Sequence, residues 1–236
     1  GDHRDMEIKQ GVFYGVGIGP GDPELLTLKA LRTLERCPIL AAPRTRSGEM
    51  LALDIVRQAL TLTDKTILPL HFTMSRDPAV LRESHLQAAS EIESHLAAGQ
   101  DVAMLNLGDV SIYATYGYLM DILAARGYET VMVPGVPSFC AVAARLGTSL
   151  TAADTPLHIL PGGSESLGEY LGLPGTKVLM KSGRNISQTT KALRQRGLMG
   201  RAAMVQDCGL PTERICRDLE QLPQDTGYFA TVIVKE

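Results

Sequence analysis

Residues 13–30 read FYGVGIGPGDPELLTLKA, a short apolar segment that runs into a glycine-rich turn and then an amphipathic segment. Four glycines fall within seven positions of this turn, and glycine lets a backbone turn tightly or approach a ligand closely. Pro20 removes an N–H that a phosphate cradle would need, and Asp22 adds negative charge at the start of the expected helix. The turn therefore favours an uncharged or cationic ligand over a pyrophosphate.

The composition is that of an ordinary globular chain. It has 236 residues, a formal net charge of −3 and 44% hydrophobic residues, which suits one large domain or two small ones and argues against a general nucleic-acid binder. No apolar run approaches the roughly 20 residues of a membrane span, and residues 1–5 resemble neither a signal nor a transit peptide. The cysteines form no C-x-x-C pair, so we expect a reducing, cytoplasmic compartment; they are Cys37, Cys140, Cys208 and Cys216.

Apolar, β-rich segments alternate with helical patterns over residues 12–150. This alternation predicts an α/β domain with a mostly parallel sheet. The expected strands are residues 12–16, 39–42, 66–68, 102–107 and 130–133, and the expected helices are residues 23–34, 48–60, 78–98, 116–126 and 138–146.

A turn-rich stretch at residues 148–156 predicts a domain boundary. We expect residues 1–11 to be a tail or an expression remnant, residues 12–150 the first α/β domain and residues 155–236 a second α/β domain. Short connections between its late strands favour a mixed sheet. The expected strands are residues 157–160, 177–180, 202–206, 213–218 and 228–234, with a helix at 186–196 and a loop or lid at 161–175.

Two further strand-to-loop junctions in the first domain carry glycine and proline. Residues 104–113 read MLNLGDVSIY, and residues 133–139 read VPGVPSF. Taken alone, the first is equally well explained as a turn followed by a helix cap, and the second is better explained as the start of a helix with a serine cap. A doubly wound sheet, however, places all the carboxyl ends of its strands at one edge, where ligands bind. The recurrence therefore predicts one site built from three junctions.

Together these three blocks resemble the tetrapyrrole (corrin and porphyrin) methylase family, whose members transfer a methyl group from S-adenosylmethionine. The resemblance runs from Val12 to the last strand. It departs from the family pattern at Val110, where a proline usually follows Gly-Asp. Residues 70–77 (LHFTMSRD) and 112–119 (IYATYGYL) point to the branch that methylates C20 of precorrin-2 or its cobalt complex, cobalt-factor II, in cobalamin synthesis.

The resemblance implies a cofactor site in a cleft between the two domains. A carboxylate and backbone groups suit a positively charged sulfonium better than a basic cradle would. Carried over by position, the cofactor-binding residues are expected to be Pro20, Leu107, Gly108, Asp109, Ile112, Ser138, Phe139, Met180, Cys208, Gly209, Thr231 and Val232.

The substrate implied by the resemblance is a flat macrocycle with eight carboxylates, and arginine side chains bind carboxylates well. The expected substrate-binding residues are Gly19, Arg44, Arg46, Phe72, Met74, Arg76, Lys181 and Arg184. Each arginine or lysine taken singly is better explained as a solvated surface charge, and only the set together predicts a carboxylate rim. We expect no metal-ligand set.

We expect direct displacement, in which C20 of the substrate attacks the sulfonium methyl group. Asp109 and Tyr113 are the candidate catalytic residues, with Tyr116 in the same block. The resemblance implies a homodimer that binds neither nucleic acid nor membrane. Alternatives are a methylase acting on another tetrapyrrole, a diphthine synthase-like methyltransferase, and a non-enzymatic α/β protein that binds a small molecule.

Overall fold

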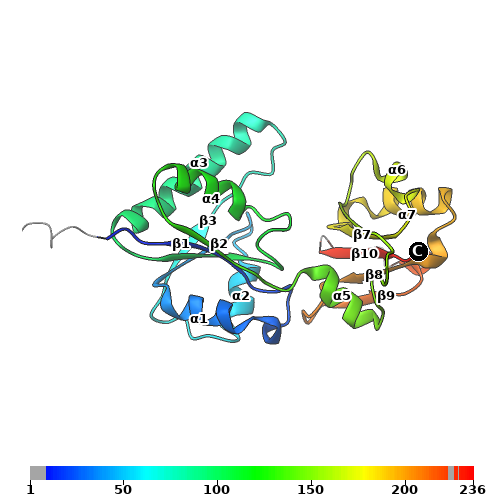
Figure 1. The fold of residues 1–236 in the computed structure, drawn as a ribbon, viewed down its shortest axis with the longest axis horizontal. Coiled ribbons are helices and arrows are strands. Elements are labelled where there is room, and N and C mark those ends of the chain that lie inside the picture. The colour runs from blue at the N-terminus through cyan, green and yellow to red at the C-terminus, as the bar shows by residue number, and fades with distance from the viewer. Residues whose placement is uncertain (1–8, 223–225, 228) are drawn as a thin grey trace, which may run out of the picture. The chain divides into compact units, whose positions relative to one another are not determined.

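The computed structural model describes residues 9–222, 226–227 and 229–236, and it divides into two compact units, Gly1–Pro137 and Ser138–Glu236 (Figure 1). Gly11 already belongs to the first unit, because its N–H donates to Leu96 O at 2.8 Å. The expected tail therefore ends earlier than residue 11. None of the helices in these described ranges is long and apolar enough to cross a membrane.

The first unit holds a five-stranded, fully parallel sheet in the order β3-β2-β4-β1-β5, which confirms the predicted parallel architecture. Every predicted strand of this unit begins and ends within two residues of its observed limits. The strands are β1 (Phe13–Gly17), β2 (Ile39–Pro43), β3 (Thr66–Leu70), β4 (Val102–Asn106) and β5 (Thr130–Val133).

Helices cover both faces of this sheet (Figure 1). One face carries α1 (Leu28–Arg36) and α2 (Leu51–Arg57), and the other carries α3 (Pro78–Ala97) and α4 (Tyr116–Ala125). Under α3 and α4 lies a core that includes the fully buried Phe13, Ile92, Leu96, Met104 and Tyr116. Its apolar burial stabilises the sheet whose edge carries the predicted site.

The single helix expected at residues 23–34 is wrong, because the segment forms two short elements. A 3-10 helix, η2 (Pro23–Leu25), is capped by Asp22, whose carboxylate accepts from Glu24 N at 2.9 Å. Helix α1 starts afresh at Leu28, where Thr27 Oγ1 accepts from Ala30 N at 2.9 Å. Two side-chain caps five residues apart each begin a helix, so the chain cannot continue one helix through both.

The second unit holds a mixed sheet in the order β6-β7-β10-β8-β9, as predicted. Strands β6 and β7 are parallel, and β10 runs antiparallel to both β7 and β8. The predicted last strand began at Tyr228, which lies outside the described residues. The strands are β6 (Leu157–Pro161), β7 (Thr176–Met180), β8 (Ala202–Gln206), β9 (Arg214–Cys216) and β10 (Ala230–Val234).

Helix α5 (Ser138–Leu146) packs against β10 and belongs to the second unit, so the contacts divide the chain earlier than the expected boundary at residues 150–155. The opposite face carries α6 (Leu167–Leu171) and α7 (Ile186–Gln195) (Figure 1). Residues 161–175 are therefore not all loop, because α6 buries Leu167 and Leu171 from successive turns. Short 3-10 helices complete the unit: η3 (Gly183–Asn185), η4 (Met199–Arg201) and η5 (Leu219–Gln221).

Candidate functional site

The carboxyl ends of β4, β1 and β5 meet through three glycines, Gly108, Gly17 and Gly135. A Cβ added at Gly17 would lie 2.7 Å from Gly135 N and 2.9 Å from Gly108 O. A Cβ added at Gly135 would lie 2.4 Å from Gly108 O. No side chain fits where these backbones touch. The prediction that the three junctions share one edge is confirmed, and we call this contact the glycine junction.

Gly19 and Gly108 extend the glycine junction by pairing as an isolated antiparallel bridge. Gly108 N donates to Gly19 O at 2.9 Å, and Gly19 N donates to Gly108 O at 3.2 Å. Gly19 has φ +78°, a left-handed conformation in which a side chain would be strained. The bridge brings Pro20 close to Leu107 and Asp109, three residues predicted to bind cofactor.

Asp109 links the loop after β4 to the loop after β5. Its Oδ1 accepts from Gly135 N at 2.9 Å, and its Oδ2 accepts from Ser111 N at 2.9 Å and from Ser111 Oγ. Partial burial by itself raises the pKa of this carboxyl, but hydrogen bonds from Ser111, Gly135 and Val110 outweigh it and lower the pKa below its usual value. Both oxygens serve loop donors, which favours a positioning role over proton abstraction.

Gly15, the first glycine of the opening block, lies within β1 and serves the core rather than a ligand. A Cβ at Gly15 would lie 2.4 Å from the ring of Tyr116, which packs directly on it. The fully buried Tyr116 hydroxyl donates to Phe13 O at 2.8 Å, and burial raises its pKa well above the usual value. These contacts leave Tyr116 no part in proton transfer.

Four described non-glycine residues have positive φ; Ala153 (φ 52°) lies in the loop between α5 and β6, and the other three follow strands whose ends lie near predicted site residues. Lys181 (φ 56°) follows β7, Asp207 (φ 50°) follows β8, and Tyr113 (φ 50°) lies between β4 and α4. Such conformations cost on the order of 1 kcal/mol or more and gather at functional sites. Tyr113 is 47% exposed, as a substrate-contacting residue requires.

In the second unit, the end of β7, the end of β8 and the start of β10 lie together at one edge. Ser182 N donates to Ala230 O at 2.8 Å, and Asp207 N donates to Phe229 O at 2.9 Å. The predicted residues at or beside this edge are Met180, Lys181, Cys208, Gly209 and Thr231. Val232 differs from them, because its fully buried side chain lies in the core under α6 and α7 and is not available to a cofactor.

A network that the sequence did not reveal fixes the loop after β8. Glu213 Oε1 accepts from Gly209 N at 3.2 Å, and Glu213 Oε2 accepts from Arg145 Nε at 2.9 Å. Slight burial raises the pKa of Glu213, but hydrogen bonds from Arg145 and Gly209 lower it below its usual value. Since Arg145 lies on α5, this loop is joined to the helix that begins with the predicted residues Ser138 and Phe139. Residues as far apart in the sequence as Arg145 and Glu213 show no periodic pattern from which their contact could be predicted.

The predicted substrate residues of the first unit also lie towards the carboxyl edge of the sheet. Arg44 N donates to Leu70 O at 2.9 Å, which joins the ends of β2 and β3. Arg44, Arg46 and Arg76 are exposed, and Met74 is 70% exposed. Phe72 is half-buried and packs on the core. In the second unit, Lys181 is half-buried, which lowers the pKa of its ammonium group, and Arg184 lies on η3.

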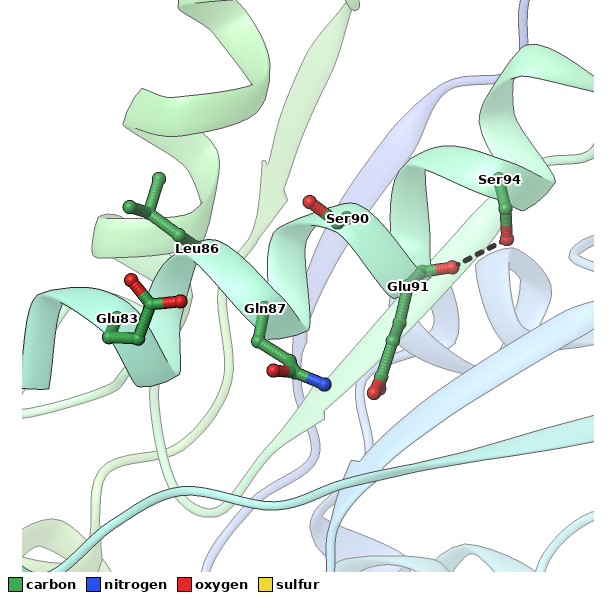
Figure 2. A pocket seen from close by; sticks show the side chains of 6 residues that line it. All are labelled: Glu83, Leu86, Gln87, Ser90, Glu91 and Ser94. Carbon is green, nitrogen blue, oxygen red and sulfur yellow. Dashed lines mark hydrogen bonds between the residues drawn. The ribbon is translucent and has the colours of Figure 1, made fainter.

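A shallow groove runs along one exposed stripe of α3 (Figure 2). Figure 2 shows that its lining comes from this helix alone: Glu83, Leu86, Gln87, Ser90, Glu91 and Ser94. The groove contains none of the residues predicted to bind cofactor or substrate, so it is not the candidate site. Within the part of the chain that the structure describes, no three His, Cys, Asp or Glu side chains are grouped to hold a metal ion.

The chain is a two-domain α/β protein whose first unit has a glycine junction at the carboxyl edge of a parallel sheet, where ligands bind in open α/β sheets. A model of the family described as Tetrapyrrole (Corrin/Porphyrin) Methylases matches residues 12–223, and the chain belongs to this family. The resemblance expected from the three glycine blocks is thereby confirmed.

Several curated relatives match most of the chain. The Precorrin-2 C(20)-methyltransferase of Sinorhizobium sp is 31% identical, over 95% of this chain and 95% of its own length. The Cobalt-precorrin-2 C(20)-methyltransferase of Salmonella typhimurium is 31% identical, over 96% of this chain and 97% of its own. The Cobalamin biosynthesis protein CobIJ of Mycobacterium tuberculosis is also 31% identical over 95% of this chain, which spans only 46% of CobIJ, about half its length.

A more distant relative is the S-adenosyl-L-methionine-dependent uroporphyrinogen III methyltransferase of Arabidopsis thaliana, 34% identical over 67% of this chain and 40% of its own length. Among solved structures, a cobalt precorrin-4 methyltransferase superposes with a TM-score of 0.76 over 95% of this chain and 94% of its own, at 20% identity. That likeness shows the shared fold.

Proposed function

We propose that this chain transfers a methyl group from S-adenosylmethionine to the C20 meso carbon of precorrin-2 or cobalt-factor II in cobalamin biosynthesis. The observation that carries the proposal is the glycine junction, where the family's three sequence blocks meet at one sheet edge. Relatives named for C20 methylation, similar along almost their whole length, support the choice of substrate.

The residues around the glycine junction fit a cationic methyl donor. Residues 15–22, 104–113 and 133–139 contain no lysine or arginine, and Asp109 contributes an ionised carboxylate. Bound S-adenosylmethionine would supply a methyl group on a positively charged sulfur. C20 would bond to this methyl carbon as the bond from the methyl carbon to sulfur breaks, so that S-adenosylhomocysteine leaves. The C20 proton would pass to solvent. A negative charge nearby attracts the sulfonium, whereas a basic cradle would repel it.

The chain's own part in the reaction is binding and alignment. In the first unit we assign the cofactor to the bridge of Gly19 and Gly108 with Pro20, Leu107 and Ile112 around it. In the second unit we assign it to the edge formed by Met180, Thr231 and the loop after β8, with Ser138 and Phe139 at the start of α5. Holding C20 in line with the methyl group lowers the barrier without a strong base.

Neither Tyr116 nor Asp109 is well suited to take the C20 proton. Tyr116 is buried in the core, and the carboxylate oxygens of Asp109 are held by loop donors. We therefore assign Asp109 to positioning and Tyr113 to contact with the substrate, with water as the proton acceptor.

Side-by-side assays with methyl-labelled cofactor test this proposal. Precorrin-2, cobalt-factor II and uroporphyrinogen III serve as the three substrates, and we expect label at C20 with one or both of the first two. If only uroporphyrinogen III became labelled, the proposed C20 methylation would be wrong and the chain would be a methylase of another tetrapyrrole. S-adenosylhomocysteine should also raise the melting temperature, because a ligand of the folded state stabilises it by mass action. No shift at saturating ligand would mean that the chain has no such site.

We further propose that the enzyme works in the cytoplasm as a homodimer. All four cysteines are free thiols, which fits a reducing compartment. Sedimentation of the purified protein tests the dimer directly.

A further inference from the structure

Three aromatic rings from separate elements stack at the surface of the first unit. The His85 ring of α3 lies parallel to the Tyr118 ring of α4, with centroids 4.6 Å apart and an interplanar angle of 14°. The Phe72 ring, from the segment between β3 and α3, meets His85 edge-on at 6.2 Å. Tyr118 remains 62% exposed. We call Phe72, His85 and Tyr118 the aromatic platform.

The aromatic platform joins two segments that the sequence analysis singled out, residues 70–77 and 112–119. Phe72 lies in residues 70–77 and Tyr118 in residues 112–119, and His85 bridges them from α3, which packs beside α4 (Figure 1). The glycine junction uses only the first residues after β4, so it does not account for either segment.

We propose that the aromatic platform, with Tyr118 outermost, stacks against one face of the tetrapyrrole and so sets substrate specificity rather than methyl transfer. This inference rests on the proposed function. An exposed ring backed by a parallel ring offers a rigid flat surface, and flat conjugated ligands stack on such surfaces. Met74, 70% exposed in the same segment as Phe72, adds a polarizable apolar contact.

The charges beside the platform suit a substrate rich in carboxylates. Arg82 lies on α3 close enough to His85 for its charge to act on the ring, and Arg76 is exposed in the segment that carries Phe72. Burial and then Arg82 lower the pKa of His85, so the ring is neutral near pH 7 and acts as an aromatic surface. Guanidinium groups around a flat apolar surface match a flat macrocycle with carboxylates at its rim.

Substitutions at Tyr118 test the proposal in the full-length protein. Tyr118→Ala should raise KM for the tetrapyrrole about three- to tenfold, the loss of one aromatic stacking contact, while KM for S-adenosylmethionine and kcat stay near wild type. Tyr118→Phe keeps the aromatic ring, so its KM for the tetrapyrrole should equal that of the wild type. Tyr170→Ala is the control: it removes an exposed tyrosine of the second unit, 39% exposed on α6, and should leave KM and kcat unchanged.

Two further measurements distinguish the possible outcomes. Tetrapyrrole absorbance reports binding without turnover, and the Kd of Tyr118→Ala for cobalt-factor II should rise by the same factor as KM. An unchanged KM in an active Tyr118→Ala variant would overturn the platform and leave the proposed function intact. A Tyr118→Ala variant that dissociates on sedimentation would also overturn it, because the rings would then be a contact between copies. Failure of the wild type to methylate either substrate would reject the function itself.

Discussion

Gly135 N donates to Asp109 Oδ1 at 2.9 Å, so the loop after β4 and the loop after β5 are held together across β1. The same carboxylate turns its second oxygen to Ser111 within its own loop. Asp109 thus fixes the loop after β4, in which Val110 follows it.

Asp109→Ala should weaken both the fold and cofactor binding. Loss of the carboxylate leaves Gly135 N–H without its acceptor, at a cost of about 1–2 kcal/mol in the free energy of unfolding. Because the loop then loses its geometry, the affinity for S-adenosylhomocysteine should fall about tenfold or more. Urea denaturation measures the first effect and calorimetry the second. A destabilised variant that binds S-adenosylhomocysteine normally would limit Asp109 to the fold.

The stabilising effect of the Asp109 carboxylate should depend on pH with a definite sign. Its pKa is lower in the folded protein than in the unfolded chain, where it is about 3.9. The unfolded state therefore binds the proton more tightly, and the contribution to stability is complete above about pH 5 and is lost as pH falls through the folded pKa. The difference in unfolding free energy between wild type and Asp109→Asn should shrink below about pH 4. A difference that stays constant from pH 7 to pH 3 would contradict this.

The glycine junction should tolerate no side chain. Gly17→Ala and Gly135→Ala each place a Cβ within 3 Å of backbone atoms that cannot rotate away, and overpacking of this kind costs about 1–3 kcal/mol or more. Gly117→Ala is the matched control, since a Cβ there meets nothing within 4 Å and alanine favours the helix by about 0.5–1 kcal/mol. In thermal melts, Gly17→Ala and Gly135→Ala should therefore have lower melting temperatures than Gly117→Ala. A melting temperature for Gly17→Ala equal to that of the control would disprove the contact.

The glycines of the opening turn show how far the sequence could predict this site. Their clustering predicts close backbone approach, and the strand-to-loop recurrence predicts one shared edge; both are local patterns, and both hold at Gly17 and Gly108. The partner of each glycine is a matter of tertiary packing. Gly15 meets the ring of Tyr116, about a hundred positions away, where no periodicity could have placed it.

The same dependence on tertiary packing explains why some elements were predicted wrongly from the sequence. Asp22 and Thr27 are both possible helix caps, and the sequence does not indicate whether one or both are used. In the folded protein both caps are formed. Helix α5 has an apolar stripe that would suit either unit, so only its packing on β10 places it in the second. The rings of His85 and Tyr118 come from different helices, and stacking between helices leaves no signal in either sequence segment.

Glu213 should act as a positioning residue for the cofactor through the loop after β8. Its carboxylate binds Arg145 of α5 and the backbone of Gly209 at once, so Glu213→Gln weakens a charge-assisted contact that holds this loop. We expect KM for S-adenosylmethionine to rise about three- to tenfold with kcat within about twofold of wild type, because the loop's position changes and the reacting groups do not.

Glu220→Gln is the matched control: it breaks an exposed pair with Arg194, of similar length and in the same unit, and surface pairs of this kind contribute little. Initial-rate kinetics at varied cofactor measure both variants. Equal KM values in the two would show that Glu213 is only one more surface ion pair, whereas recovery of the low KM in Glu213→Asp would show that the carboxylate itself positions the loop.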